Sequence, residues 1–335
     1  MARVGSLNDG AEIGSTIYWD AIVSTPTATT AQKASGSYSY EYTTGEASTK
    51  NLPSALSEFY YRVRFRWGTG LAIGGAWLNF RASTTVLLSV RINTSTGLIE
   101  LYTSTTTKVA TSSIPTQADT WYCVELHVKV ADSLGVFDLR IDGISAATFS
   151  GDTKPGADTT VDNILVNFAA GGSGNFWLDD IALNDTTGVA ENDWCGLGRY
   201  AAGLYPTSAG DATQFTPTGA ALNYQCVDDI PPDDDTSYVE SSTSGHQDLY
   251  GILDFTGTNR TIQRVQVIGV ARDTSGAGQI YLNVKSGATL DKSAAISLTA
   301  SYARYVGDDH TVDPNTSAAW TDPALALAQI GPEVV

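Results

Sequence analysis

The stretch FYYRVRFRW, residues 59–67, constrains the fold of this chain more than any other. Apolar residues fill every second position, and a tyrosine and three arginines fill the positions between them. The apolar positions are Phe59, Tyr61, Val63, Phe65 and Trp67. Because successive side chains of a β-strand point to opposite faces of a sheet, this period of two predicts a half-buried antiparallel strand.

Short apolar or alternating runs recur along the chain, separated by Ser, Thr and Gly, and helical periodicity is scarce. Asp142-Gly143 suits a tight hairpin turn with positive φ angles. Only 320–331 has a helical pattern, with Asp322 as N-cap and Pro323 at the first helical position. The further predicted strands are 76–82, 86–92, 98–102, 121–130, 136–149, 164–168, 176–183, 249–255, 261–273, 279–286 and 295–306. Many short strands without helices between them predict an all-β protein built from β-sandwiches.

The texture of the sequence divides the chain into three segments. Strand patterns fill residues 1–188 and resume at 238–335, and the second set ends in the short predicted helix. Between them, 189–237 is rich in Gly, Ala, Thr, Asn and Pro and ends in VDDIPPDDDTSY. We expect an N-terminal sandwich, a loop-rich connecting segment and a smaller C-terminal β domain. The aspartate run is typical of a solvated loop, and calcium binding is the alternative.

Charge and composition exclude several classes of function. The chain has 36 acidic and 19 basic residues, a net charge of −17, so we expect no nucleic-acid partner. No apolar run approaches the roughly 18 residues of a membrane span, and we expect no membrane insertion. The first residues lack the apolar core of a secretory signal, so synthesis in a cytosol is expected. Three cysteines do not make a disulfide framework, although Cys195 and Cys226 could pair.

The acidic doublet Asp179-Asp180 lies in the apolar run NFWLDDIALND. On a regular strand the two side chains point to opposite faces, so they cannot act as the paired carboxyl groups that a glycosidase places roughly 5–10 Å apart. One carboxylate then enters a half-buried setting, where it needs hydrogen-bond donors or a cation. The two alternatives are a structural aspartate and a structural Ca²⁺ ion bound by Asp180, Asp9 and Glu12, since this ion prefers oxygen ligands.

Two kinds of residue are candidates for a glycan-binding or partner-binding surface. Arg62, Arg64 and Arg66 share one strand face, which is either paired within the chain or docks an acidic neighbour, including a second copy. Tyr60 and Trp77 could stack on sugar rings, but strands also use aromatic residues in their cores. The histidines lack metal-site spacing, and no nucleophile motif is present, so no catalytic residue is assigned.

The runs TWYCVELHVKV, VFDLRIDG and NFWLDDIAL resemble the strands of the concanavalin A-like lectin/glucanase family, over about residues 7–185. The resemblance implies a jelly-roll sandwich, a fold that hosts lectins, hydrolases and structural modules. Its glucanase members carry a catalytic strand of the type E-x-D-x-x-E. No glutamate in this sequence begins such a strand, which counts against hydrolysis.

The C-terminal runs IPPDDDTSYVESSTSGHQDLYGILDF, VQVIGVARD and NTSAAWTDPALALAQIG resemble a module of tailed-bacteriophage virion proteins. The resemblance implies a non-enzymatic structural component of the virion, a tail appendage, a fibre or a head-surface decoration. Its partners would then be other virion proteins and copies of itself. One alternative is a carbohydrate-binding adhesin that recognises host-surface glycans, and a further one is a polysaccharide-degrading enzyme.

Overall fold

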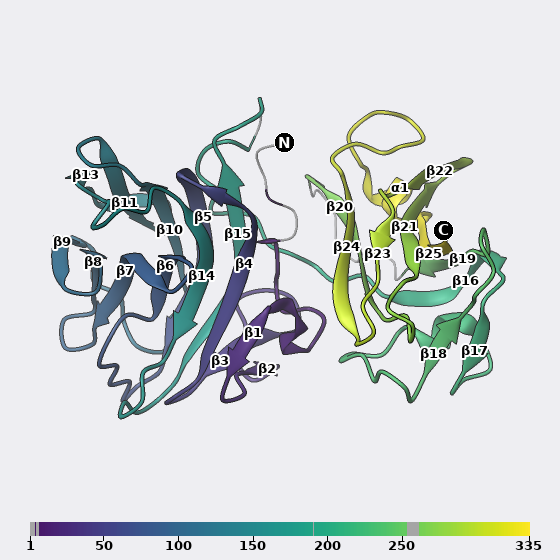
Figure 1. The fold of residues 1–335 in the computed structure, drawn as a ribbon, viewed down its shortest axis with the longest axis horizontal. Coiled ribbons are helices and arrows are strands. Elements are labelled where there is room, and N and C mark those ends of the chain that lie inside the picture. The colour runs from purple at the N-terminus through teal and green to yellow at the C-terminus, as the bar shows by residue number, and fades with distance from the viewer. Residues whose placement is uncertain (1–3, 5–6, 190, 253–260) are drawn as a thin grey trace. The chain divides into compact units, whose positions relative to one another are not determined.

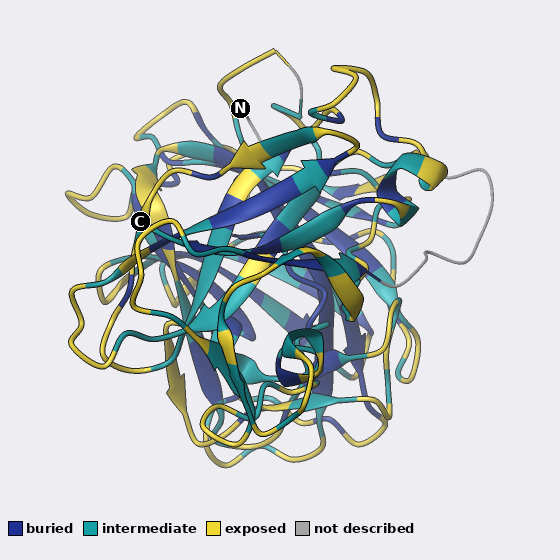
Figure 2. Ribbon diagram, turned by 90° about the vertical axis from the view of Figure 1, so that its right-hand side faces the viewer, coloured by how far each residue is buried: buried dark blue, intermediate teal, exposed yellow. Residues whose placement is uncertain are grey.

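The computed structural model describes residues 4, 7–189, 191–252 and 261–335 (Figure 1). It divides the chain into two compact units, Met1–Ala202 and Gly203–Val335, here called the N-terminal and the C-terminal unit. The regular secondary structure of both is almost entirely antiparallel strands, and the described part contains one short α-helix. The predicted all-β fold is therefore confirmed. Figure 2 shows that the buried residues gather in the strands and the exposed ones in the loops.

The N-terminal unit is a sandwich of two antiparallel sheets. The seven-stranded sheet has the order β1-β4-β14-β6-β7-β8-β9. Its strands are β1 (Ala21–Val23), β4 (Ala47–Leu56), β6 (Leu78–Ala82), β7 (Thr85–Asn93), β8 (Leu98–Thr103), β9 (Thr107–Thr111) and β14 (Val161–Asn167). A short 3₁₀ helix, η2 (Thr16–Tyr18), precedes β1.

The eight-stranded sheet has the order β12-β11-β10-β5-β15-β3-β2, and β13 pairs with β11. Its strands are β2 (Thr27–Thr29), β3 (Ser39–Tyr42), β5 (Glu58–Trp67), β10 (Tyr122–Lys129), β11 (Gly135–Ile141), β12 (Ile144–Ala147), β13 (Ser150–Gly151) and β15 (Phe176–Asp185). The hairpin between β11 and β12 turns at Asp142 and Gly143, whose φ angles are 49° and 76°. Positive φ at both turn positions is what an Asp-Gly pair accommodates, and the predicted hairpin is confirmed.

The core of this unit lies between the two sheets. The alternating apolar residues predicted for 59–67 are all buried. They meet the other sheet directly, since the rings of Phe59 and Phe80 are 5.3 Å apart and those of Phe65 and Trp77 are 4.2 Å apart. Each such aromatic side chain stabilises the fold by roughly 1.5–3 kcal/mol through its burial.

The segment predicted as a connector, 189–237, is not a separate element. Residues up to 202 belong to the N-terminal unit and those from 203 to the C-terminal unit. In the second part, β16 (Pro206–Thr213) pairs with β19 (Asp248–Ile252), and β17 (Thr216–Thr218) and the 3₁₀ helix η3 (Asn223–Cys226) follow. The polar composition hid this strand, because an edge strand that exposes much of its surface needs few apolar residues.

The C-terminal unit contains a six-stranded sheet of order β16-β19-β25-β21-β22, with β23 paired to β21, and two ribbons, β17–β18 and β20–β24. Its buried core includes Leu282, Val284 and Trp320. No described helix is long and apolar enough to cross a membrane. The remaining strands are β18 (Tyr238–Glu240), β20 (Val265–Ala271), β21 (Gln279–Ser286), β22 (Thr289–Lys292), β23 (Ile296–Ser297), β24 (Ala303–His310) and β25 (Gln329–Val334).

The predicted C-terminal helix is shorter than expected. Helix α1 spans Asp322–Ala326, and its N-cap is Thr321, whose Oγ1 accepts the N–H of Ala324 at 3.2 Å. Asp322 as N-cap and a helix through residue 331 are therefore wrong. The chain instead enters the sheet as β25 between β19 and β21, because pairing on both sides satisfies its backbone groups. The predicted strand at 249–255 is β19, and its last three residues lie outside the described ones.

Candidate functional site

The acidic doublet lies on β15, which runs between β3 and β5 in the eight-stranded sheet. The register of β15 against β5 shifts between Asp179 and Ala182, and Asp180 has a φ of 48°. These two features define a β-bulge, which turns a side chain away from the regular alternation of the strand. The premise that the two carboxylates point to opposite faces is therefore wrong.

Both carboxylates of the doublet bind the same loop. Asp179 Oδ2 accepts the backbone N–H groups of Ala34 at 2.8 Å and Ser35 at 3.2 Å. Asp180 accepts the Ser35 hydroxyl at 2.9 Å and the N–H of Ala201 at 3.0 Å. Asp179 and Asp180 are each 1% exposed, so neither touches solvent or a substrate. The doublet holds two loops against β15, one at Ala34 and Ser35 and one at Ala201.

Two further carboxylates join the doublet to form what we call the acidic cluster: Asp9, Glu12, Asp179 and Asp180. The backbone of Asp9 pairs with Ile181 through two hydrogen bonds, of 3.0 and 2.7 Å, and its side chain accepts the hydroxyl of Tyr40. Glu12 accepts the N–H groups of Ser37 and Tyr38. The N-terminal segment thus brings its two acids to the loop that the doublet binds.

Burial changes the proton affinity of this cluster. Burial raises the pKa of Asp179 to about 8, and the charge of Asp180 adds to this effect. Burial also raises the pKa of Asp180 and of Glu12. Two guanidinium groups partly oppose this effect at Asp180: Arg62 Nε donates to its carbonyl at 3.2 Å, and Arg64 Nε lies 3.8 Å from Oδ2. Burial therefore favours the protonated form of these acids.

The predicted calcium ligands Asp180, Asp9 and Glu12 lie close enough for their charges to interact. Within the residues that the structure describes, however, no three His, Cys, Asp or Glu side chains form a group that could hold a metal ion. The carboxylate oxygens point to N–H and hydroxyl donors, as described above. These side chains alone do not make a ligand set, and a calcium ion stays a prediction.

The predicted arginine surface is covered by the chain itself. Residues 191–201, which we call the strap, cross the outer face of the eight-stranded sheet. Arg62 Nη1 donates to the carbonyl of Gly196 at 2.9 Å, and Arg64 Nη2 donates to that of Leu197 at 2.8 Å. Glu125 Oε1 accepts the N–H of Gly196 at 2.7 Å. An arginine surface free for a partner is therefore not what the structure has.

The other predicted surface residues differ in their accessibility. Arg66 is 9% exposed and pairs with Asp119 at 3.0 Å. Tyr60 is partly exposed, and its ring stacks on His127 at 4.3 Å. Trp77 is 0% exposed and packs on Phe65 in the core, so its prediction as a surface residue is wrong. Its neighbours in sequence gave no sign of which face of the sheet it would join.

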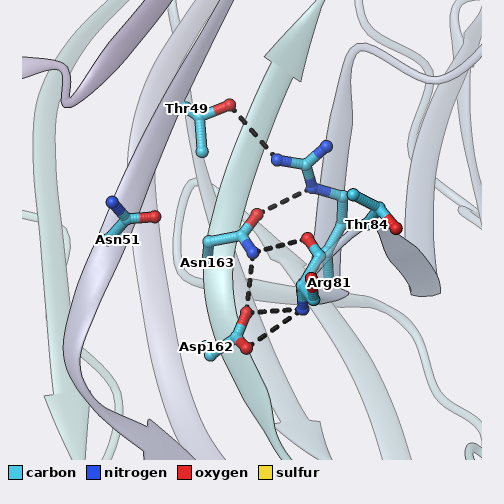
Figure 3. A pocket seen from close by; sticks show the side chains of 7 residues that line it. Thr49, Asn51, Arg81, Thr84, Asp162 and Asn163 are labelled. Carbon is cyan, nitrogen blue, oxygen red and sulfur yellow. Dashed lines mark hydrogen bonds between the residues drawn. The ribbon is translucent and has the colours of Figure 1, made fainter.

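A depression that the sequence did not reveal lies on the outer face of the seven-stranded sheet, across β4, β14 and β6 (Figure 3). Its volume is about 420 Å³, and it is shallow and largely open to solvent. We call it the polar groove, because every residue that lines it is polar or charged. The lining residues are Thr49, Asn51, Arg81, Ser83, Thr84, Asp162 and Asn163.

Hydrogen bonds fix the side chains of the polar groove (Figure 3). Arg81 donates from Nε to Asn163 Oδ1 at 2.7 Å and from Nη2 to Thr49 Oγ1 at 3.2 Å. Asp162 accepts the N–H of Ser83 at 2.8 and 3.0 Å and the Asn163 amide at 2.6 Å. The register brings these groups together, because Asn163 lies opposite both Asn51 and Arg81.

The polar groove could have been found in part from the sequence. The strand signal at 164–168 begins one residue after Asn163, and the signal at 76–82 includes Arg81. No sequence pattern, however, states that β14 lies between β4 and β6. Arg81 and Asn163 are 82 residues apart in the sequence, and they meet because β6 and β14 are neighbours in the sheet.

The chain matches no protein-family model and no curated protein. Among solved structures it is similar to the cellulose induced protein Cip1, with 16% identity over 57% of this chain and 100% of that one, at a TM-score of 0.40. It is also similar to an endo-β-1,4-glucuronan lyase from the fungus Trichoderma reesei, with 14% identity, coverage of 53% and 94%, and a TM-score of 0.37. A third similar structure is domain 4 of AbnA, a GH43 extracellular arabinanase from Geobacillus stearothermophilus, in complex with arabinotriose. The identity is 10% over 55% of this chain and 94% of that one, at a TM-score of 0.42.

Proposed function

We propose that this protein is a non-catalytic carbohydrate-binding protein whose glycan site is the polar groove. The observation that carries the proposal is a depression of about 420 Å³ on a rigid sheet, lined only by hydrogen-bonding side chains. Sugar hydroxyls need both donors and acceptors held in fixed positions, and the bonded side chains of Arg81, Asp162 and Asn163 supply both.

The proposal selects the adhesin alternative over the other predicted functions. The similar solved structures include, by their names, a glucuronan lyase and an arabinanase domain bound to arabinotriose. Their TM-scores of 0.37 and 0.42 are too low to support a function. The proposal therefore rests on the polar groove itself. In more detail, we propose that the N-terminal unit is a concanavalin A-like jelly roll and that its partners are glycans of a host surface.

The absence of catalysis is part of the proposal. Hydrolysis of a glycosidic bond uses two carboxyl groups on opposite sides of that bond. The polar groove has a single acid, Asp162, and both of its oxygens already accept the N–H of Ser83. The acidic doublet is buried, as described above. These features support a site that holds a saccharide without cleaving it.

The virion role inferred from the C-terminal runs stays a prediction, and so does the location in a virion. It implies many copies of this chain in a purified particle, together with other virion proteins. Mass spectrometry of purified particles tests it, because a structural component is abundant there. An adhesin and a virion component are compatible, since host recognition is a function of particle surfaces.

We also propose that a Ca²⁺ ion binds at the acidic cluster as a structural ion. Support comes from the four acids and from the raised pKa of Asp179, Asp180 and Glu12. A cation there would offset the electrostatic cost of these buried carboxylates. Backbone carbonyls would have to complete the ligand set, because three acidic side chains do not converge.

The test of the glycan site is a glycan array followed by titration calorimetry with the best saccharide. Asn51→Ala and Thr84→Ala each remove an exposed hydrogen-bonding group from the polar groove without touching the core. Thr107→Ala, at an exposed position on β9, is the matched control. We expect each groove variant to bind about 3- to 10-fold more weakly, as the loss of one hydrogen bond implies, and the control to bind normally. Saccharide binding that all three variants retain would refute the site.

A further inference from the structure

The guanidinium of Arg81 lies in the polar groove and has no carboxylate partner of its own among the described residues. The chain has 36 acidic residues against 19 basic ones. Some arginines pair with a carboxylate, as Arg64 and Arg66 do, whereas Arg62 donates to carbonyl groups instead. Arg81 forms no ion pair with any residue that the structure describes, although it lies beside Asp162 in the same groove.

Neutral oxygens hold the guanidinium of Arg81 in place. Its Nε and Nη2 donate to Asn163 and Thr49, which lie on the two strands next to one another, β14 and β4 (Figure 3). The Nη1 group donates to no atom of the described residues, so it is available in the groove. A guanidinium that is fixed in this way loses little conformational entropy when a ligand binds.

The acid beside Arg81 is already bonded. The oxygens of Asp162 accept hydrogen bonds from Ser83 and Asn163, which turn the carboxylate toward the strand backbone. Burial lowers the pKa of Arg81, and the charge of Asp162 only opposes this effect. An anionic ligand in the groove would accept hydrogen bonds from the Nη1 group of Arg81, in addition to the attraction that Asp162 already supplies.

We propose that the polar groove is specific for acidic saccharides, and that Arg81 binds their carboxylate or sulfate group through its unused N–H donors. This inference rests on the proposed function, because it names the class of glycan for the same site. The planar guanidinium matches the two oxygens of a carboxylate or sulfate, which a hydroxyl of a neutral sugar does not. Asn51 and Thr84, which are exposed in the groove, then contact the sugar hydroxyls.

Two pairs of soluble ligands test the proposal with the full chain by titration calorimetry. These are polygalacturonate, the same polymer after complete methyl esterification, and a sulfated galactan next to its desulfated form. Esterification removes the negative charge and keeps the sugar backbone. We expect binding of an acidic polymer to be about 10- to 100-fold tighter than binding of its neutral form. A carboxylate-specific and a sulfate-specific groove are distinguished by which acidic polymer binds.

Two arginine variants complete the experiment. Arg81→Gln removes the charge and is expected to lower the affinity for the acidic polymer to that for the neutral one. Arg91→Gln is the matched control, because Arg91 lies on the same sheet in β7 but stacks on Tyr102 outside the groove. It is expected to bind as the unaltered chain does. Equal losses in both variants would indicate non-specific attraction and would overturn the proposal.

The ligand comparison separates this inference from the proposed function. Equal affinity for acidic and neutral polymers overturns the specificity and leaves carbohydrate binding intact. Failure to bind any saccharide of a glycan array overturns the proposed function as well. If Arg81→Gln does not fold, the comparison of esterified and free polymer still decides, since it uses the unaltered chain.

Discussion

The acidic cluster predicts that this protein loses stability as the pH rises from 5 to 7. Burial raises the pKa of Asp179 from 3.8 to about 8 in the folded chain. Between these two values the folded state binds a proton that the unfolded state has released. The stability that protonated Asp179 contributes is therefore fully present below pH 3.8 and is lost as the pH rises through about 8.

The expected magnitude follows from proton linkage. Each pH unit inside this window changes the free energy of unfolding by about 1.36 kcal/mol for one group, so two units change it by roughly 3 kcal/mol. Asp180 and Glu12 have raised pKa values and act in the same direction. Groups with lowered pKa values, such as Glu58 and Asp273, contribute only below about 4.5 and leave this interval unaffected.

Urea unfolding measures this effect, followed by tryptophan fluorescence at pH 5, 6 and 7 in the presence of EDTA. Six of the seven tryptophans lie before residue 203 and report on the N-terminal unit. The free energy of unfolding should be roughly 3 kcal/mol lower at pH 7 than at pH 5.

Asp179→Asn is the control for this prediction, because it removes the titrating group and keeps the shape of the side chain. Its pH slope should be shallower by about 1.36 kcal/mol per unit. At low pH it should be less stable than the unaltered chain, since an amide group cannot accept all the bonds from Ala34, Ser35 and Asp180. A free energy of unfolding that stays constant or rises from pH 5 to 7 would refute the assignment of a protonated buried carboxyl group.

Three other predictions concern the metal ion, the strap and the C-terminal sheet. If Ca²⁺ binds at the acidic cluster, EDTA lowers the melting temperature and added calcium restores it, and an unchanged melting temperature dismisses the ion. Trp194→Ala should lower the free energy of unfolding in urea by about 1–2 kcal/mol. The substitution removes a ring that lies 3.9 Å from the guanidinium of Arg140 and also contacts Tyr60. A change below about 0.5 kcal/mol would contradict a packed strap. Gly331→Ala should destabilise the C-terminal unit by more than about 2 kcal/mol, measured by calorimetry. The reason is that an added Cβ would lie 2.0 Å from the carbonyl oxygen of Asp248. A variant as stable as the unaltered chain would show that β25 does not pack here.

The polar groove illustrates how far sequence reasoning reaches. Arg81 alternates with apolar residues in LNFRA, and this alternation is visible in the sequence, whereas Asn163 lies in VDNILVN, which does not alternate. Which of these side chains meet is set by strand order, and no local pattern encodes it. For the arginine stripe the sequence left two alternatives open, and the structure decides for pairing within the chain, since Arg62 and Arg64 donate to carbonyl groups of the strap.

The sequence by itself determined the all-β fold, the inward face of β5 and the hairpin at Asp142-Gly143, because period and turn chemistry act between residues that are neighbours in the chain. Only the tertiary structure decided that the strap covers the arginines, that β25 joins the sheet and that a bulge turns the acidic doublet onto one loop. Each of these depends on a partner far along the chain, which competes with the local preference and prevails through backbone pairing and burial.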